Sequence, residues 1–338
     1  MALLEVNDLK THFRTDDGIV KAVDGVSFAV EKGQVFGIVG ESGSGKSVTC
    51  LTIMGLNPKA NTMTSGEALW KGKDLLRMSS KQLRSIRGDE IAMIFQDPMT
   101  SLNPVKTIGS QLIEAVMLHR DISRKAARAR AVELLKAVGI PRAEGRIDDY
   151  PHQFSGGMRQ RVMIAMALIN DPDLLIADEP TTALDVTTQA QIINLMVQLQ
   201  KDFGSAIIII THDLGVIAEA ADDVVVMYGA QVVERAPVTN LFNRPHHPYT
   251  WGLLGSLPRL DADVERLTQI QGQPPSLLNP PRGCRFHPRC PYVMEICKTE
   301  VPALAPISTD PGHLQRCHLD EETKDREAAK LLDSMIAA

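Results

Sequence analysis

The chain contains the glycine-rich segment Gly40-Glu41-Ser42-Gly43-Ser44-Gly45-Lys46-Ser47, which matches the pattern G-x-x-x-x-G-K-[ST]. An apolar run, Val35 to Val39, leads into the segment, and a helix-compatible stretch, Ser47 to Met54, follows it. In this strand, loop and helix context, backbone N–H groups and the positive end of a helix face an anion. Because glycine has no Cβ, the backbone can approach phosphate groups closely. The segment therefore predicts a fold built around a phosphate-binding loop.

The residue types in this loop have distinct expected roles. Lys46 is expected to reach the β- and γ-phosphates of a nucleoside triphosphate, and Ser47 is expected to coordinate Mg²⁺. The other residues predicted to contact the nucleotide here are Gly40, Ser42, Gly43, Ser44, Gly45 and Val48.

The composition predicts a folded protein with no segment long enough to cross a membrane. The 338 residues are enough for about two domains. The longest aliphatic run, Ala206 to Ile210, is far shorter than the ~20 residues that span a bilayer. The segment Met1 to Lys10 lacks the features of a secretion signal, so we expect a cytoplasmic protein. A formal net charge of −5 gives no support to bulk nucleic-acid binding, and thiols in a reducing compartment are not expected to form disulfides.

Strand-like and helix-like segments alternate along most of the chain. Between Ile108 and Val138, apolar residues recur at helical spacing, which predicts a helical insertion. Its basic run, Arg124 to Arg130, is expected to be a solvated face. The strand-like apolar runs are Leu3 to Val6, Val26 to Val30, Val35 to Val39, Ile91 to Phe95, Leu174 to Ala177, Ala206 to Ile210 and Val224 to Met227. This alternation predicts an α/β fold with a mostly parallel sheet and with ligands at the carboxyl ends of its strands.

A second candidate site follows the apolar run Leu174 to Ala177, which ends in Asp178 and Glu179. Mg²⁺ prefers carboxylate and phosphate oxygens and retains several waters, so Asp178 is predicted to bind Mg²⁺ through water. Glu179 is predicted to be the general base, or to polarise the water that attacks the γ-phosphate. Helix capping before Pro180 is the alternative role for either acid.

Further motifs, taken with these two sites, resemble those of ATP-binding-cassette (ABC) ATPases from Ala2 to about Gln231. They are Gln96 after Ile91 to Phe95, Ser155-Gly156-Gly157 before Met158 to Asn170, Thr182-Ala183-Leu184-Asp185, and His212 after Ala206 to Ile210. The resemblance implies a RecA-like parallel sheet core, an N-terminal antiparallel β subdomain and an inserted α-helical subdomain at about residues 97–172.

The resemblance also assigns roles to single residues. Gln96 is implied to lie near Mg²⁺ and the attacking water, on a segment, Phe95 to Asn103, that contacts a transmembrane partner. His212 is implied to contact the γ-phosphate, and Asp185 to belong to a loop facing the opposite subunit. Phe13 is the aromatic residue predicted to stack on adenine, with an exposed strand or the core as its alternative place.

The segment Ser155-Gly156-Gly157 has a physical interpretation of its own. Glycines ahead of a helix leave bare N–H groups and the positive end of the helix dipole, which makes a second anion site. Ser155-Gly156-Gly157 resembles the signature motif of ABC ATPases. In that family the signature closes over the ATP of a facing cassette, so two cassettes enclose two ATP molecules. The usual Leu-Ser-Gly-Gly-Gln is Phe154-Ser155-Gly156-Gly157-Met158 here. We expect a competent signature with altered side-chain contacts at Met158.

The C-terminal part of the chain is rich in proline and contains four of the five cysteines, Cys284, Cys290, Cys297 and Cys317. A small unit with few large apolar residues is typically held together by cross-links through its cysteines, such as a bound metal. A zinc site is possible, but the C-x₂₋₄-C pair common in zinc sites is missing. The familiar iron–sulfur spacings are not matched either, so spacing does not decide between the metals. The fifth thiol, Cys50, is expected to pack in the core.

Nearly the whole chain resembles the ATP-binding subunits of dipeptide and oligopeptide permeases, and three segments carry this resemblance. They are Phe95 to Pro104, Asn243 to Thr250 and Gly283 to Pro291. This resemblance, together with the change to Pro-rich sequence after about residue 240, implies a nucleotide-binding domain over 1–240, a Pro- and Cys-rich extension over 241–320 and a charged, helix-prone tail over 321–338. It also implies a [4Fe–4S] cluster on the four cysteines, with Zn²⁺ as the alternative.

The implied function is that of the ATP-hydrolysing subunit of a peptide importer, peripheral to the cytoplasmic face of the membrane. Its implied partners are a second, related cassette chain, two transmembrane permease subunits and, indirectly, an extracytoplasmic peptide-binding protein, without nucleic acid. The alternatives are an importer for another solute and a non-transport ABC ATPase with a metal-sensing C-terminal module. Non-transport types insert a long coiled coil between the Lys46 and Asp178 motifs or fuse two cassettes, and this chain has neither.

Overall fold

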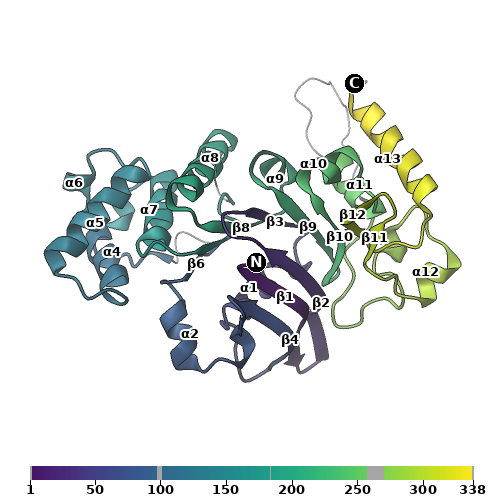
Figure 1. The fold of residues 1–338 in the computed structure, drawn as a ribbon, viewed down its shortest axis with the longest axis horizontal. Coiled ribbons are helices and arrows are strands. Elements are labelled where there is room, and N and C mark those ends of the chain that lie inside the picture. The colour runs from purple at the N-terminus through teal and green to yellow at the C-terminus, as the bar shows by residue number, and fades with distance from the viewer. Residues whose placement is uncertain (1, 97–100, 183, 257–269, 337–338) are drawn as a thin grey trace. The chain divides into compact units, whose positions relative to one another are not determined.

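The computed structural model describes residues 2–96, 101–182, 184–256 and 270–336. The chain forms two compact units, each built from separated stretches of sequence. One unit contains residues 1–2, 30–36 and 77–210, and the other contains residues 3–29, 37–76 and 211–338. Most helices and strands of both are labelled in Figure 1.

The first unit has a parallel sheet at its centre, in the order β3-β8-β7-β6. Its strands are β6 (Ile91–Ile94), β7 (Leu174–Asp178), β8 (Ala206–Thr211) and the first residues of β3 (Val35–Val39). The pairs β6/β7 and β7/β8 are parallel. Strands β7 and β8 are buried along their whole length, as continuous aliphatic runs in a parallel sheet are.

The helices of the first unit follow the apolar spacing of the sequence. They are α2 (Ser80–Ile86), α4 (Ile108–Met117), α5 (Arg124–Ala137), α6 (Ala143–Arg146), α7 (Gly156–Leu168) and α8 (Val186–Phe203), with the 3₁₀ turn η2 (Pro151–Gln153). In α4 the residues Ile108, Leu112, Ile113 and Val116 are buried, which confirms the helical period expected there. In the basic run of α5, Arg124 is exposed and Arg128 pairs with Asp148 at 2.7 Å.

The second unit contains a four-stranded sheet in the order β2-β1-β4-β5. Its strands are β1 (Leu4–Thr15), β2 (Gly18–Val30), β4 (Thr62–Trp70) and β5 (Lys73–Asp74), followed by the 3₁₀ turn η1 (Leu75–Arg77). The pairs β1/β4 and β4/β5 are antiparallel. Helix α1 (Lys46–Ile53) packs against β1.

The other strands of the second unit correct the expectation of a mostly parallel sheet. Their order is β11-β12-β10-β9-β3, and β9/β10, β10/β12 and β11/β12 are antiparallel. The bounds are β9 (Asp223–Tyr228), β10 (Gln231–Pro237), β11 (Ala305–Ile307) and β12 (Asp310–Gln315). A two-residue turn, Gly229-Ala230, joins β9 to β10 with φ values of 53° and 70°, the geometry that closes a tight hairpin. The chain therefore contains antiparallel as well as parallel strand pairs.

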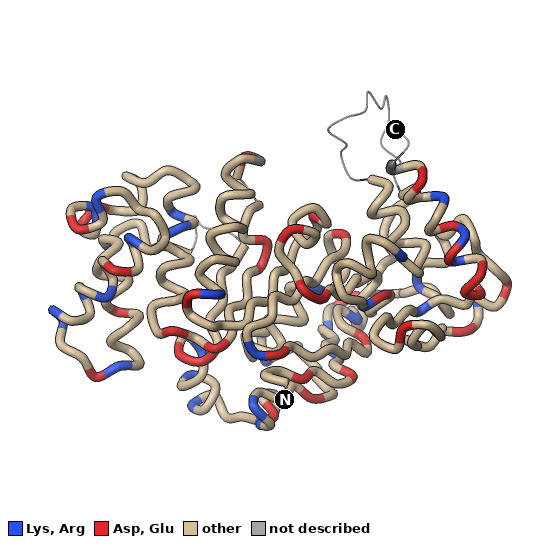
Figure 2. The backbone as a smooth tube through the Cα atoms, turned by 45° about the horizontal axis from the view of Figure 1, so that its top comes forward, with Lys and Arg blue, Asp and Glu red and all other residues tan. Residues whose placement is uncertain are grey.

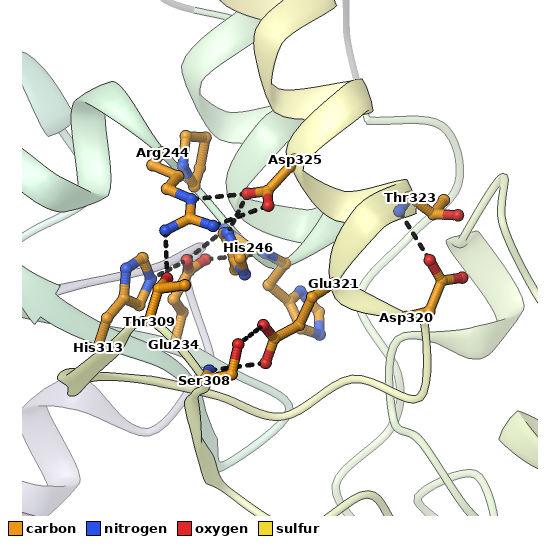
Figure 3. Close-up of polar contacts among 12 residues, drawn as sticks. Glu234, Arg244, His246, Ser308, Thr309, His313, Asp320, Glu321, Thr323 and Asp325 are labelled. Atoms are coloured by element: carbon orange, nitrogen blue, oxygen red, sulfur yellow. Dashed lines mark hydrogen bonds and ion pairs between the residues drawn. The ribbon is translucent and has the colours of Figure 1, made fainter.

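Helices and one 3₁₀ turn complete the second unit. They are α9 (Leu214–Ala220), α10 (Val238–Asn243), α11 (Pro248–Gly255), η3 (His287–Arg289), α12 (Glu295–Thr299) and α13 (Glu321–Ile336). Helix α13, which corresponds to the charged tail, is attached by polar contacts shown in Figure 3. Arg244 donates to both carboxylate oxygens of Asp325 at 2.6 and 2.7 Å, and the Ser308 N–H donates to Glu321 at 2.8 Å.

Basic and acidic residues are interspersed in both units (Figure 2). Among the described residues, no helix combines the length and the apolar composition needed to cross a bilayer.

Candidate functional site

The phosphate loop belongs to the second unit, between the buried strand β3 and helix α1. The Lys46 side chain is buried, and its Nζ donates to the carbonyl oxygens of Gly40 at 2.7 Å and Glu41 at 3.0 Å. Because both acceptors belong to the loop itself, the ammonium group lies within the loop. This is the position from which a cation can meet phosphate oxygens bound by the loop.

Two glycines of the loop are required by close contacts. A Cβ on Gly40 would meet the carbonyl oxygen of Met227 at 2.2 Å, and one on Gly45 would meet that of Ala22 at 2.4 Å. Their φ values, 151° and 102°, also disfavour any residue with a side chain. Gly43 has a φ of 77° and no atom within 4 Å of a built Cβ, so conformation alone favours glycine there.

The rest of the loop fits a phosphate ligand. Ser42 and Gly43 are exposed, whereas Ser44 is buried and its Oγ has no hydrogen-bond partner among the described residues. A buried hydroxyl without a partner is costly unless a ligand or water satisfies it. Ser47 and Val48, in the first turn of α1, are half-buried. The arrangement therefore suits the nucleotide expected from the sequence.

Two further predicted residues lie in the second unit. Phe13 is half-buried on β1, opposite Thr62 of β4, so it is a strand residue with part of its ring accessible. His212 is exposed and directly follows β8. Their proposed roles at adenine and at the γ-phosphate stay predictions.

The two carboxylates lie in the first unit at the end of β7. Asp178 is the last residue of the strand and is buried, and Glu179 is half-buried. Glu179 has a φ of 45°, and its N–H donates to the carbonyl oxygen of Ile210 at 2.9 Å. A positive φ at a residue other than glycine costs about 1–3 kcal/mol and is common at active sites. The backbone thus holds Glu179 in a conformation that its side chain does not favour.

Two side chains orient the Glu179 carboxylate. Nε2 of Gln96, which directly follows β6, donates to Oε2 of Glu179 at 3.0 Å. Oγ1 of Thr182 donates to the same oxygen at 2.8 Å. The structure therefore brings together two of the predicted catalytic residues and adds Thr182, a residue of the Thr182-Ala183-Leu184-Asp185 motif. Asp97 to Thr100, in the expected partner-contacting segment, lie outside the described residues.

The signature residues begin helix α7 in the first unit. Ser155 is its N-cap, and its Oγ accepts a hydrogen bond from the Met158 N–H at 3.3 Å. Gly156 is exposed, and a Cβ on Gly157 would meet Thr188 of helix α8 at 3.0 Å. The start of α7 is thus close to the first turn of α8.

Asp185, the N-cap of α8, belongs to the same region. Its carboxylate accepts from the Thr188 N–H at 2.9 Å and from the Thr188 hydroxyl at 2.8 Å. The hydrogen bond from the Thr188 backbone, with help from its side chain, lowers the pKa of Asp185. Asp185 is therefore an ionised, exposed capping residue beside the signature.

The four C-terminal cysteines gather in the second unit. The N–H of Cys284 donates to the carbonyl oxygen of Cys297 at 2.8 Å, and all four thiols lie within electrostatic range of one another. Burial raises the pKa of Cys290 to about 12 and that of Cys317 to about 11. Cys50 is buried in α1, as expected. In the part of the chain that the structure describes, no group of three or more His, Cys, Asp or Glu side chains is arranged to hold a metal ion. The metal centre stays a prediction.

Sequence reasoning missed two residues that contact the phosphate loop. The Glu41 N–H donates to the hydroxyl of Tyr249 at 2.9 Å, and Arg289 donates to both carboxylate oxygens of Glu41 at 2.6 and 3.0 Å. The two residues lie 208 and 248 positions from Glu41 in the sequence. No local pattern could have indicated either contact.

Comparison with protein families gives two matches. Residues 23–182 match the model described as "ABC transporter", and residues 233–297 match "Oligopeptide/dipeptide transporter, C-terminal region". The dipeptide transport ATP-binding protein DppD of Bacillus subtilis (strain 168) is 53% identical over 321 residues, covering 95% of each chain. The oligopeptide transport ATP-binding protein OppD of Escherichia coli (strain K12) is 51% identical over 316 residues, covering 94% of this chain and 93% of the relative.

The chain belongs to the dipeptide and oligopeptide transport ATP-binding proteins. Solved structures of ATP-binding cassettes are among those that match this chain. A dimeric, post-hydrolysis structure of the cassette MJ0796, bound to ADP and Pi, superposes with a TM-score of 0.62 at 27% identity. The match covers 70% of this chain and 98% of that cassette. The ABC cassette fold is therefore confirmed, with mixed sheets.

Proposed function

We propose that this chain is the ATP-hydrolysing subunit of an ABC importer for dipeptides or oligopeptides. Over nearly its whole length it is similar to transport ATP-binding proteins of that class. One observation of the structure supports the proposal most directly. Glu179, at the end of a buried strand, is oriented by Gln96 and Thr182 as an acceptor for a proton. An oriented carboxylate is what activation of a water for attack on a γ-phosphate requires.

We assign the nucleotide contacts to the residues of the phosphate loop. Its backbone N–H groups, Lys46 and the buried Ser44 hydroxyl bind the phosphates of ATP. Ser47, Gln96 and Asp178 are the residues we assign to Mg²⁺, since hydroxyl, amide and carboxylate oxygens suit this ion. Mg²⁺ would supply charge neutralisation at the phosphates. His212 is assigned to the γ-phosphate and Phe13 to adenine.

A second cassette completes each ATP site in this proposal. Ser155, Gly156 and Gly157 at the start of α7, with the ionised Asp185 beside them, form the surface that faces the partner's nucleotide. The exposed side of this signature and the dimeric state of the matching cassette MJ0796 support the assignment. The second cassette is proposed to be a related but different chain.

Transmembrane permease subunits are the partners that ATP turnover drives, and an extracytoplasmic peptide-binding protein delivers the solute. We place their contact on the helical subdomain, about 97–172, and on the segment around Phe95, a residue that is 45% exposed. Large apolar side chains left in water are typical of surfaces that a partner covers. The chain would accordingly sit at the cytoplasmic face of the membrane.

The domain division we propose is a cassette over 1–240, a Cys-rich extension over 241–320 and a tail over 321–338. In the extension, the four gathered thiols are proposed to hold a [4Fe–4S] cluster. A single zinc ion with Zn–S bonds of about 2.3 Å needs its sulfurs about 4 Å apart. The cluster is proposed because the Cys-bearing segment resembles that of dipeptide and oligopeptide permease ATP-binding subunits, and Zn²⁺ is the alternative.

Isolation of the native complex tests the proposal. Membrane and cassette proteins that copurify with the tagged chain should include two permease subunits, and the complex should hydrolyse ATP in response to peptide. A purified chain that hydrolyses ATP at full speed as a strict monomer would contradict it. For the cluster, anaerobically purified protein should be brown and Cys290→Ser colourless. A colourless wild type with stoichiometric zinc would exclude the cluster.

A further inference from the structure

The phosphate loop is contacted by Tyr249 and by residues 282–290, which we call the C-terminal segment. Glu41, the second residue of the loop, makes three kinds of contact within the second unit. Its carbonyl oxygen accepts from Lys46, its N–H donates to Tyr249, and its carboxylate accepts two hydrogen bonds from Arg289. Tyr249 belongs to α11 and Arg289 to η3. Two C-terminal side chains therefore define the position of one loop residue.

Arg289 is placed for this contact by its surroundings. Its side chain is only 5% exposed. The guanidinium group also donates to the carbonyl oxygens of Ile270 and Gln271, and it lies 5.7 Å from the centre of the Tyr228 ring. A bidentate pair between arginine and a carboxylate has a defined geometry, which a lysine could not reproduce. The contact thus sets both distance and orientation.

The pairing has an electrostatic reason. The loop is proposed to bind a triphosphate, which is negatively charged. A carboxylate in the loop repels the phosphates unless a cation neutralises it, because neighbouring like charges repel each other. Glu41 occupies one of the variable positions of the motif, so the acid is not required by the motif itself. Arg289 compensates the charge and leaves Lys46 available for the phosphates.

A second arginine of the same segment reaches the loop through the β9–β10 turn. Arg285 donates to the carbonyl oxygen of Gly229 and pairs with Asp24. The next residue of the turn, Ala230, donates its N–H to the carbonyl oxygen of Ser44 at 3.1 Å. Between the two arginines, the ring of Phe286 packs edge-on against Tyr228, with 5.1 Å between centroids. The segment therefore contacts the loop directly at Glu41 and reaches Ser44 only indirectly, through the β9–β10 turn.

We propose that the C-terminal segment positions and neutralises the phosphate loop, with Arg289 as the positioning residue for Glu41. The inference rests on the nucleotide role proposed for Gly40 to Ser47. Its consequence is that ATP affinity depends on a segment far from the loop in sequence. Because Arg289 and Arg285 directly adjoin Cys290 and Cys284, changes in the cysteine region can reach the loop through these side chains.

Substitution of Arg289 tests the proposal by equilibrium binding of a non-hydrolysable ATP analogue with Mg²⁺ to the full chain. Arg289→Met leaves the Glu41 charge unpaired, so we expect the dissociation constant to rise on the order of tenfold. The double variant Glu41→Gln with Arg289→Met should recover much of the affinity, because the repelling charge is gone. If Arg289 had a merely structural role, the additional change Glu41→Gln would not restore the affinity for the ATP analogue.

The matched control is Arg282→Met, the same change at an exposed arginine of the same segment, which should bind as the wild type does. If Arg289→Met does not fold, Arg289→Lys, which keeps the cation without the fork, should show a loss of a few-fold. Wild-type affinity in a folded Arg289→Met or Arg289→Lys protein, or additive losses in the double variant, would overturn the inference. A wild-type chain that binds no nucleotide would instead refute the proposed function.

Discussion

Nε2 of Gln96 donates a hydrogen bond to Oε2 of Glu179, with 3.0 Å between the two atoms. Gln96 follows strand β6 and Glu179 follows strand β7, and these strands are parallel neighbours. Parallel strands end at the same edge of a sheet, so residues 83 positions apart in sequence meet there. The contact brings two motifs that are separate in the sequence together at one edge of the sheet.

Glu179→Gln is expected to separate ATP binding from hydrolysis. The amide keeps the shape of the side chain but cannot accept a proton, and loss of a general base typically slows a reaction by about 10²–10⁴-fold. Steady-state ATPase rates should fall by this factor while nucleotide affinity stays near that of the wild type. Near-normal hydrolysis would remove Glu179 from this role.

Gly45→Ala is expected to destabilise the protein and impair nucleotide binding. The new Cβ would meet the Ala22 carbonyl oxygen at 2.4 Å, at a φ of 102° that alanine disfavours, for a cost of at least about 2 kcal/mol. Thermal unfolding and binding of an ATP analogue measure both effects. Gly145→Ala in α6 is the control, since nothing lies within 4 Å of its Cβ and alanine favours helices. Equal melting temperatures for the two variants would contradict the prediction.

Ser155→Ala is expected to affect both stability and turnover. Loss of the N-cap of α7 should cost about 1 kcal/mol, and the proposed partner-facing signature loses its hydroxyl. Ser123→Ala removes the equivalent cap of α5, where Oγ accepts from the Ala126 N–H at 3.2 Å. Both variants should melt at similarly lowered temperatures, but only Ser155→Ala should reduce ATPase activity of the assembled complex. Parallel losses of activity would argue against a signature role for Ser155.

Stability is expected to fall as the pH is lowered from about 6.5 to 4, with His247 as one cause. The ring is buried, its Nδ1 accepts from the Tyr249 N–H at 3.1 Å, and burial lowers the pKa of His247 to about 4. In this window the unfolded chain binds a proton at His247 that the folded chain does not, so the free energy of unfolding rises with pH and is lost on acidification.

His247→Asn keeps an acceptor at the helix N-cap but does not titrate. Denaturant unfolding at several pH values between 4 and 7 should therefore show a shallower pH dependence for this variant, whatever its absolute stability. The hydrogen bond from Arg244 is the main cause of the lowered pKa of Asp325. Its contribution to the free energy of unfolding is therefore lost only at pH values below the usual pKa of an aspartate. An unchanged slope between pH 4 and 6.5 would exclude His247 as a cause.

Local pattern was sufficient for much of the site. The phosphate loop, the acids Asp178 and Glu179 and the helical spacing of α4 could be predicted because each depends on residues close together in sequence. The antiparallel pairing of β10, β12 and β11 could not, because strand direction depends on which distant segments meet at the sheet edge. The two-residue turn Gly229-Ala230 is a local signal for the neighbouring antiparallel pair β9/β10 only.

By itself, the sequence determined that this chain has a phosphate-binding loop, a strand ending in two carboxylates and four cysteines near its C-terminus, since motifs and periodicities are properties of neighbouring residues. Only the tertiary structure decided which distant groups serve those motifs. Thr182 and Gln96 orient Glu179, and Arg289 and Tyr249 hold Glu41. The physical reason is that a hydrogen bond or ion pair depends on proximity in space, and folding brings together residues that the linear pattern does not relate.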